Sequence, residues 1–196
     1  MREGLWVESG GGDNVVGSSG NVVPWPGVEG LSLSADRADN VNGAELLGFK
    51  RSDNALAGLT GGEVLIIANE ELVGVSADAV SKADAVIVIG TVLPKSVTTA
   101  ATVLPIATFA EEEGTFTNLR GRVQRFLQAK ATPGHARPSW YVLSDLLTAC
   151  GETSEFFTAS AAFDALAKNE PAFNGLSYDS LGLKGAVIAG AMAGAK

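Results

Sequence analysis

The fold is decided by two apolar stretches, Glu63-Val64-Leu65-Ile66-Ile67-Ala68 and Asp84-Ala85-Val86-Ile87-Val88-Ile89-Gly90. Both are continuous runs of apolar, mostly β-branched residues, which is typical of strands buried on both faces of a parallel sheet. Between them, residues 76–83 can form a short helix with the Ser76 hydroxyl as its N-cap. Strand, helix and strand at this spacing predict a right-handed βαβ unit.

A third apolar run, residues 102–107, follows the βαβ unit and contains Pro105. Proline cannot donate a backbone hydrogen bond, so this run is expected at a sheet edge or a strand end. The sequence therefore predicts an α/β fold with a small parallel, Rossmann-like sheet and flanking helices. So small a sheet leaves apolar faces and edges uncovered. We expect the chain either to have a partner or to add strands from residues 1–60.

The N-terminal third is rich in glycine, with 13 of the 24 glycines in residues 1–62. Gly10-Gly11-Gly12 and Gly17-Ser18-Ser19-Gly20 predict turns and loops, because glycine tolerates positive φ. Neither segment has the Lys and Ser/Thr of a phosphate loop, nor the spacing of a dinucleotide fingerprint. We expect a loop-rich start with one short strand at Leu5 to Val7.

The last third is predicted to be helical. Ser139 is expected to cap a helix over residues 140–150, and Gly151 to end it. One apolar face of that helix is expected to hold Leu143, Leu146, Leu147 and Cys150, with Cys150 as a small buried residue.

A second helix is expected over Glu155 to Asn169, with Ser154 as its cap. Its apolar stripe would comprise Phe156, Phe157, Phe163 and Leu166. The chain is therefore divided into a partial α/β domain, residues 1–128, and a C-terminal helical extension, residues 129–196.

Charge and composition exclude several functions. The net charge of −8 argues against nucleic-acid binding, because phosphate contacts need Lys and Arg. A single Cys150 and a single His135 cannot complete an iron–sulfur cluster or a four-ligand zinc site, so no metal site is expected on this chain. The most apolar stretch, residues 85–110, contains Pro94, Lys95 and Pro105, so no direct membrane insertion is expected. We expect a cytoplasmic protein.

Three acids, Glu111 to Glu113, come before a basic segment that begins at Arg120. If residues 120–126 are extended, Arg122 and Gln124 point to the same side. Arg and Gln side chains on one face can bind an anion or a planar polar ligand through forked donors. The alternative is a solvated strand face whose charge the three glutamates neutralise.

The order of residues here resembles the molybdopterin oxidoreductase signature. The resemblance rests on Val103-Leu104-Pro105, then Glu111-Glu112-Glu113-Gly114-Thr115-Phe116-Thr117-Asn118, then Gly121-Arg122-Val123-Gln124. It implies a molybdopterin-type α/β domain, of which this chain would hold a C-terminal portion. If a molybdopterin is bound, the resemblance implies that the cofactor-binding residues are Thr115, Asn118, Arg122 and Gln124.

The flanking segments resemble one branch of that superfamily, the large iron–sulfur subunit of NADH-quinone oxidoreductase, respiratory complex I. They are Arg125-Phe126-Leu127-Gln128-Ala129-Lys130, residues 133–140, and residues 171–182. In that subunit the iron–sulfur clusters lie in N-terminal segments, and the molybdopterin-type domain is generally regarded as a scaffold that has lost its pterin. The resemblance implies a peripheral-arm location at the inner membrane and other subunits of that arm as partners.

The sequence therefore leaves two hypotheses for the function. The first is a structural portion of the NADH-quinone oxidoreductase peripheral arm, with no catalytic residue and no cofactor of its own. The iron–sulfur clusters would then lie on a missing N-terminal part or on partner subunits. The alternative is a molybdopterin-binding fragment of a molybdenum-dependent oxidoreductase. Hydrolase chemistry is not expected, because His135 lies in a turn-rich segment and no nucleophile-elbow motif is present.

Overall fold

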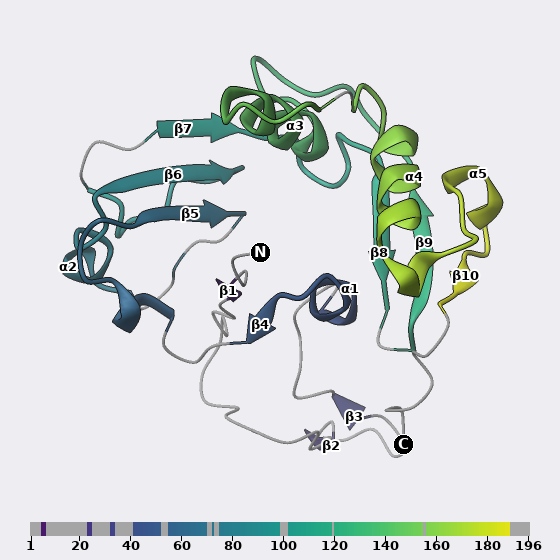
Figure 1. Ribbon diagram of the computed structural model, residues 1–196, viewed down its shortest axis with the longest axis horizontal. Helices are drawn as coiled ribbons and strands as arrows, with labels where there is room; N and C mark the ends of the chain where they lie inside the picture. Colours follow the sequence, from purple (N-terminus) through teal and green to yellow (C-terminus); the bar gives the residue numbers. More distant parts are fainter. Residues whose placement is uncertain are drawn as a thin grey trace.

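Figure 1 shows the computed structural model of the chain. The residues that the structure describes are 5–6, 23–24, 32–33, 41–51, 55–69, 72, 75–98, 102–118, 120–154 and 156–188. The two glycine-rich segments predicted as loops, residues 10–12 and 17–20, lie outside the described residues.

A three-stranded parallel sheet forms from β5 (Val64–Ala68), β6 (Ala85–Gly90) and β7 (Thr102–Pro105), in the order β5-β6-β7 (Figure 1). The short helix α2 (Ala77–Val80) connects the first two strands, and the Ser76 hydroxyl accepts a hydrogen bond from the Ala79 N–H at 3.3 Å. The α/β fold, the βαβ unit, its N-cap and the edge position of the proline-containing strand are thus confirmed.

The two faces of this sheet are covered unequally. On one face, Ile67, Val86 and Val88 are buried against Val80 of α2 and Leu72. On the other, Ile89 and Ile106 pack against Val142 of α3 (Ser139–Ala149). The helix α3 covers only the β6–β7 side of this face, so Val64 and Ile66 of β5 remain 58% and 52% exposed. Burial on both faces, expected from the apolar runs, therefore holds for only part of the sheet.

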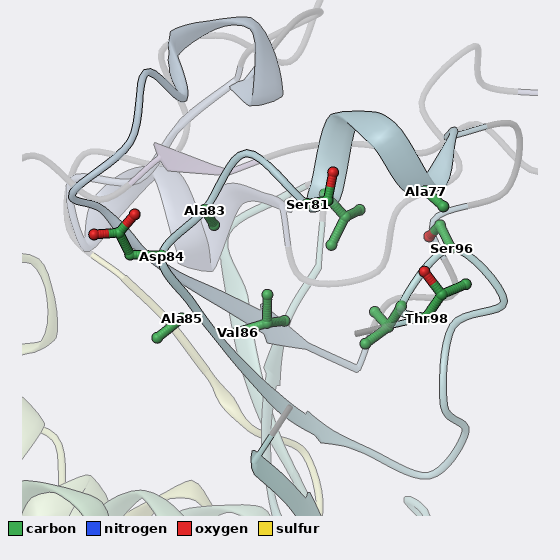
Figure 2. A pocket seen from close by; sticks show the side chains of 10 residues that line it. Ala77, Ser81, Ala83, Asp84, Ala85, Val86, Ser96 and Thr98 are labelled. Atoms are coloured by element: carbon green, nitrogen blue, oxygen red, sulfur yellow. The ribbon is translucent and has the colours of Figure 1, made fainter. Parts of the chain in front are cut away.

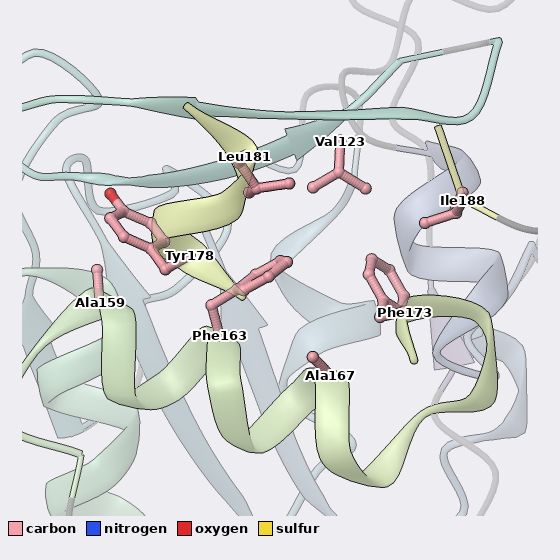
Figure 3. Packing of buried hydrophobic residues seen from close by; sticks show 8 residues of the cluster. All are labelled: Val123, Ala159, Phe163, Ala167, Phe173, Tyr178, Leu181 and Ile188. Atoms are coloured by element: carbon pink, nitrogen blue, oxygen red, sulfur yellow. The ribbon is translucent and has the colours of Figure 1, made fainter. Parts of the chain in front are cut away.

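A second, antiparallel sheet contains β8 (Gly114–Thr117), β9 (Arg122–Phe126) and β10 (Ala186–Val187), in the order β10-β9-β8. Against it pack α4 (Ala159–Asn169) and α5 (Tyr178–Leu181), with the 3₁₀ turn η2 (Pro171–Phe173) between them. Figure 3 shows the resulting core, in which Val123 of β9, fully buried, meets Phe163, Phe173 and Leu181.

The helix α3 differs from its sequence-based prediction. Pro138 is its N-cap residue, and the Ser139 side chain makes no cap because Ser139 is already the first helical residue. Val142 and Ser144 are the buried residues of the helix, whereas Leu143, Leu147 and Cys150 are exposed. The predicted apolar face was right for Leu146, which packs on the sheet, and wrong for the other three residues, because the sheet contacts the Val142–Leu146 side of the helix.

The next helix begins four residues later than predicted. Thr158 caps α4, its hydroxyl accepting from the Ala161 N–H at 3.0 Å, and Ser154 instead hydrogen-bonds through its hydroxyl to the Ser144 hydroxyl. Phe157 precedes the helix and is 72% exposed, so it does not belong to the apolar stripe. Because the Thr158 hydroxyl already accepts from an N–H group of the first turn, the helix begins after Thr158 and does not extend back to the residues before it.

The remaining elements are short and lie before β5. They are the parallel pair β1 (Leu5–Trp6) and β4 (Lys50–Arg51), the antiparallel pair β2 (Val23–Pro24) and β3 (Ser32–Leu33), α1 (Val41–Leu46), and the 3₁₀ turn η1 (Ala55–Gly58). These strands pair with one another, so no described strand before residue 60 extends the parallel sheet. Among the described residues, no helix has the length and apolar character needed to cross a membrane. The division of the chain at residue 128 stays a prediction.

Candidate functional site

The β8–β9 hairpin carries most of the residues singled out by the sequence. Its register pairs Thr115 with Arg125 and Phe116 with Gln124. Because neighbours along a strand point to opposite faces, Thr115 and Arg125 share one face, and Phe116, Gln124 and Arg122 share the other. We call these the inner face and the outer face of the hairpin.

The inner face is covered by α5. The Arg125 guanidinium lies over the Tyr178 ring at 5.6 Å from the centroid, and its Nη1 is 4.0 Å from Asp179 Oδ1. Burial raises the pKa of the Tyr178 hydroxyl, and the charge of Glu113 adds to that effect. Thr115 therefore belongs to a face that the C-terminal part of the chain covers.

The outer face presents aromatic rings and forked donors. The Phe116 and Phe126 rings stack with centroids 4.9 Å apart and an interplanar angle of 23°. A Cβ at Gly114 would come within 3.0 Å of the Phe126 ring, which explains why glycine precedes the Thr-Phe-Thr strand. Phe116 is 41% exposed, and Gln124 beside it is exposed as well.

Two of the predicted residues make contacts that hold the hairpin itself. The Asn118 side-chain oxygen accepts hydrogen bonds from the N–H groups of Arg120 and Arg122, each at 2.9 Å, and so closes the turn. Arg122 Nη1 donates to the carbonyl oxygens of Lys184 and Gly185, at 3.3 and 3.4 Å, and so joins β9 to the segment before β10.

The four predicted cofactor residues are thus not brought to one point. Arg122 and Gln124 share the outer face, Asn118 shapes the turn beside them, and Thr115 lies on the opposite face. Guanidinium, amide and an exposed aromatic ring suit a planar polar ligand such as a pterin, so the outer face fits one wall of such a site. Cofactor binding by these residues stays a prediction.

Two of the three glutamates before the hairpin are engaged elsewhere than on its arginine face. Glu111 is bound by the Lys130 ammonium at 2.9 Å and by the Thr108 N–H at 3.1 Å, and these hydrogen bonds hold the pKa of its carboxyl below the ordinary value. Glu112 accepts a hydrogen bond from the Ser139 N–H at the start of α3. Burial raises the pKa of Glu112, although that hydrogen bond acts in the opposite direction. Both acids therefore brace the loops around the hairpin.

The carboxyl ends of the parallel strands hold two polar residues that the sequence reasoning missed. Asn69 directly follows β5 with φ of +50°, and Thr91 directly follows β6. The Thr91 hydroxyl donates to Asn69 Oδ1 at 3.4 Å, and the Asn69 N–H donates to the Ile89 carbonyl at 2.6 Å. In parallel α/β sheets ligands bind beyond this edge. The signal was available, because each polar residue comes immediately after an apolar run.

Two cavities among the described residues bear on ligand binding. Figure 2 shows the smaller, about 50 Å³, beneath α2, where the buried Ser96 hydroxyl has no hydrogen-bond partner. That volume is far below the few hundred Å³ of a typical cofactor pocket. The larger, about 370 Å³, lies between β7 and α3. No group of three or more His, Cys, Asp or Glu in the described part of the chain is placed to hold a metal ion.

A parallel βαβ sheet with polar residues at its carboxyl edge, followed by a hairpin with forked donors, defines an α/β domain. The chain belongs to the molybdopterin oxidoreductase family, whose model matches residues 13–149.

Relatives within this family are formate dehydrogenases by name. The F420-dependent formate dehydrogenase 2 subunit alpha of Methanococcus maripaludis is 35% identical over 180 residues, covering 82% of this chain and 26% of that protein. A putative formate dehydrogenase of Bacillus subtilis is 34% identical over 104 residues, covering 53% and 11%. Another, of Staphylococcus aureus, is 33% identical over 103 residues, covering 53% and 10%. The chain therefore spans about a quarter or less of these relatives.

These names bear on the finer part of the expected family. The molybdopterin oxidoreductase signature is confirmed by the family match. The three relatives described above carry the name formate dehydrogenase and not that of the large iron–sulfur subunit of NADH-quinone oxidoreductase, which is in the same superfamily. The molybdopterin alternative is accordingly the better supported of the two functions.

Proposed function

We propose that this chain is a part of a molybdenum-dependent oxidoreductase of the formate dehydrogenase type, and that it supplies one wall of the molybdopterin site. The observation that carries the proposal is the family match over residues 13–149, which includes the whole β8–β9 hairpin. The chain spans 26% of the M. maripaludis subunit, so the full activity requires further polypeptide.

The outer face of the hairpin is the proposed contact with the cofactor. Gln124 offers an amide with both donor and acceptor, and Phe116 offers an exposed ring for stacking. The Arg122 guanidinium adds a positive charge to this face, and its Nη1 donates hydrogen bonds to the Lys184 and Gly185 carbonyl oxygens. Such a set favours a planar, partly anionic ligand, and a guanidinium also suits a carboxylate such as formate. Iron–sulfur clusters would lie on the remaining polypeptide.

The test is cofactor analysis of the chain purified from its source together with the proteins that accompany it. Molybdenum by mass spectrometry, pterin by fluorescence after oxidation, and formate oxidation with an artificial electron acceptor are the three readouts. The proposal expects all three. A preparation that contains neither molybdenum nor pterin contradicts it.

A second candidate is the structural role in the peripheral arm of NADH-quinone oxidoreductase. Two features favour it, the resemblance of residues 125–130 and 171–182 and the engagement of Asn118 and Arg122 in contacts within the chain. The chain would then join other subunits of that arm, carry no cofactor, and lie at the cytoplasmic side of the inner membrane. Co-purification with NADH dehydrogenase activity, without pterin, would support this candidate.

A further inference from the structure

One face of the parallel sheet is incompletely covered. Strand alternation and the register place Val64 and Ile66 of β5 on the same face as Ile87 of β6, the face on which α3 packs. Val64 and Ile66 are 58% and 52% exposed, and Ala68 and Ala85 are exposed beside them. We call these four residues the open face.

The open face continues into the larger cavity. Ile87, the register partner of Ile66, lines this groove of about 370 Å³ together with Leu104 of β7 and Leu146 of α3. At its rim stand Arg137 and Asp145, whose side chains approach to 3.7 Å and remain 59% and 64% exposed. The surface is therefore an apolar trough with one charged pair along its border.

The shape of this trough suits a helix. Strands lie about 4.8 Å apart and packed helices about 10 Å apart, so one helix covers roughly two strands. Because α3 packs on the β6–β7 side, the face over β5 and the adjoining part of β6 carries no described helix. Parallel sheets are normally covered by helices on both faces.

No described helix of this chain fills that place. The helices after α3 pack on the antiparallel sheet, and η1 contacts α2. The relative from M. maripaludis has nearly three quarters of its length outside the aligned part. We infer that the open face and its groove receive an amphipathic helix from the polypeptide that carries the rest of the molybdopterin oxidoreductase domain. The apolar stripe of that helix covers Val64 and Ile66, and its polar border meets Arg137 and Asp145.

This inference rests on the proposed function only in taking the partner from the same family. It is tested by placing a photoreactive p-benzoylphenylalanine at position 66 in the chain as it exists in its source. After irradiation, cross-linked peptides are identified by mass spectrometry. The matched control carries the same group at position 183, where Leu183 is 90% exposed on a different surface.

The expected result is a cross-link from position 66, and not from position 183, to a helical segment of a chain that matches the same family. A cross-link to a second copy, to an unrelated protein, or no cross-link overturns the inference. The outcome is independent of cofactor content. If position 66 cross-links to a partner of the same family but the complex lacks molybdenum and does not oxidise formate, only the proposed function is contradicted. If the complex is active but no cross-link forms, only this inference is contradicted.

A pair of charge variants provides a second measurement. Ile66→Glu is expected to reduce recovery of the partner at least about tenfold, because a carboxylate would be buried in an apolar contact. Leu183→Glu is expected to leave recovery unchanged. Both variants keep the melting temperature of the isolated chain, since both side chains are exposed there. Undiminished recovery with Ile66→Glu contradicts the inference.

Discussion

The Glu112 carboxylate accepts a hydrogen bond from the backbone N–H of Ser139 at 2.6 Å. The contact joins the turn before β8 to the first residue of α3, across 27 positions of the chain. The first N–H groups of a helix lack partners within the helix, and its N-terminus favours negative charge. Glu112 thereby provides the cap that Pro138 and the Ser139 side chain do not.

Removing this carboxylate should loosen α3. We expect Glu112→Ala to lower the free energy of unfolding by about 1 kcal/mol, the usual cost of a lost N-terminal cap. Glu112→Gln, which keeps an acceptor oxygen, should recover part of that loss. Urea unfolding followed by circular dichroism measures both. Glu152→Ala, an exposed change just after the helix, is the control, and equal stability of Glu112→Ala and Glu152→Ala would contradict the cap.

The neighbouring Glu111 predicts a pH dependence. Its pKa is lowered in the folded chain, chiefly by the hydrogen bond from Lys130. A lowered glutamate pKa contributes stability above the unfolded value, about 4.3, and that contribution disappears as the pH falls through the folded value. Lys130→Gln should therefore lower the melting temperature at pH 7 by roughly 1–3 °C, a small change because the Lys130 side chain is largely exposed. The effect should be smaller at pH 3, because protonation of Glu111 removes the ion pair.

A control separates this effect from a general change of charge. Lys95→Gln removes the same charge in an exposed turn. The melting temperatures of wild type and both variants are compared at the two pH values by scanning calorimetry. A Lys130→Gln effect that is undiminished at pH 3, or that Lys95→Gln reproduces, would exclude the ion pair as its cause.

The parallel sheet could be predicted because its strands are continuous apolar runs, and Ser76 is a cap that local sequence specifies. The faces of α3 could not, because Leu143 and Leu147 have the same helical spacing as Val142 and Leu146. Only the position of the sheet decides which pair is buried.

The candidate site was predictable to a similar extent. Arg122 and Gln124 share a face by strand alternation alone, and the structure bears this out. The side on which Thr115 lies depends on the register between β8 and β9, which the turn around Asn118 sets. A sequence motif shows which residues are near one another along the chain, and it does not show how two strands are paired.

Gly185 is predicted to be irreplaceable in the connection to β10. It has φ of +68°, and an added Cβ would collide with the Val123 carbonyl oxygen and come within 2.7 Å of the Gln124 side chain. Gly185→Ala should cost more than about 2 kcal/mol, from the backbone strain and the clash together. Gly151→Ala, at φ of +88° with open space around it, should show the strain alone, about 1 kcal/mol. Equal costs in urea unfolding would show that β10 does not approach β9 so closely.

The C-terminal core predicts a large effect from one aromatic residue. Phe163 is 4% exposed and meets the rings of Phe173 and Tyr178 edge-on, with centroids 6.3 and 6.2 Å away. Phe163→Ala should lower the free energy of unfolding by about 3–5 kcal/mol, through lost burial and the cavity it leaves. Phe157→Ala, at a residue 72% exposed, should stay within about 0.5 kcal/mol of wild type. Similar losses in the two variants would contradict the packing around α4.

The outer face of the hairpin allows a ligand role to be separated from a structural one. Gln124 is exposed, so Gln124→Ala should leave the melting temperature within about 2 °C of wild type and still reduce the pterin content of the purified complex severalfold. Arg122 also holds the Lys184 and Gly185 carbonyls, so Arg122→Ala should lower both stability and pterin content. Asn174→Ala, exposed after η2, is the control for both measurements. A residue that contacts the ligand must change binding without first changing the fold. If Gln124→Ala retains full pterin, and Arg122→Ala loses pterin only in proportion to its lost stability, the outer face has a structural role.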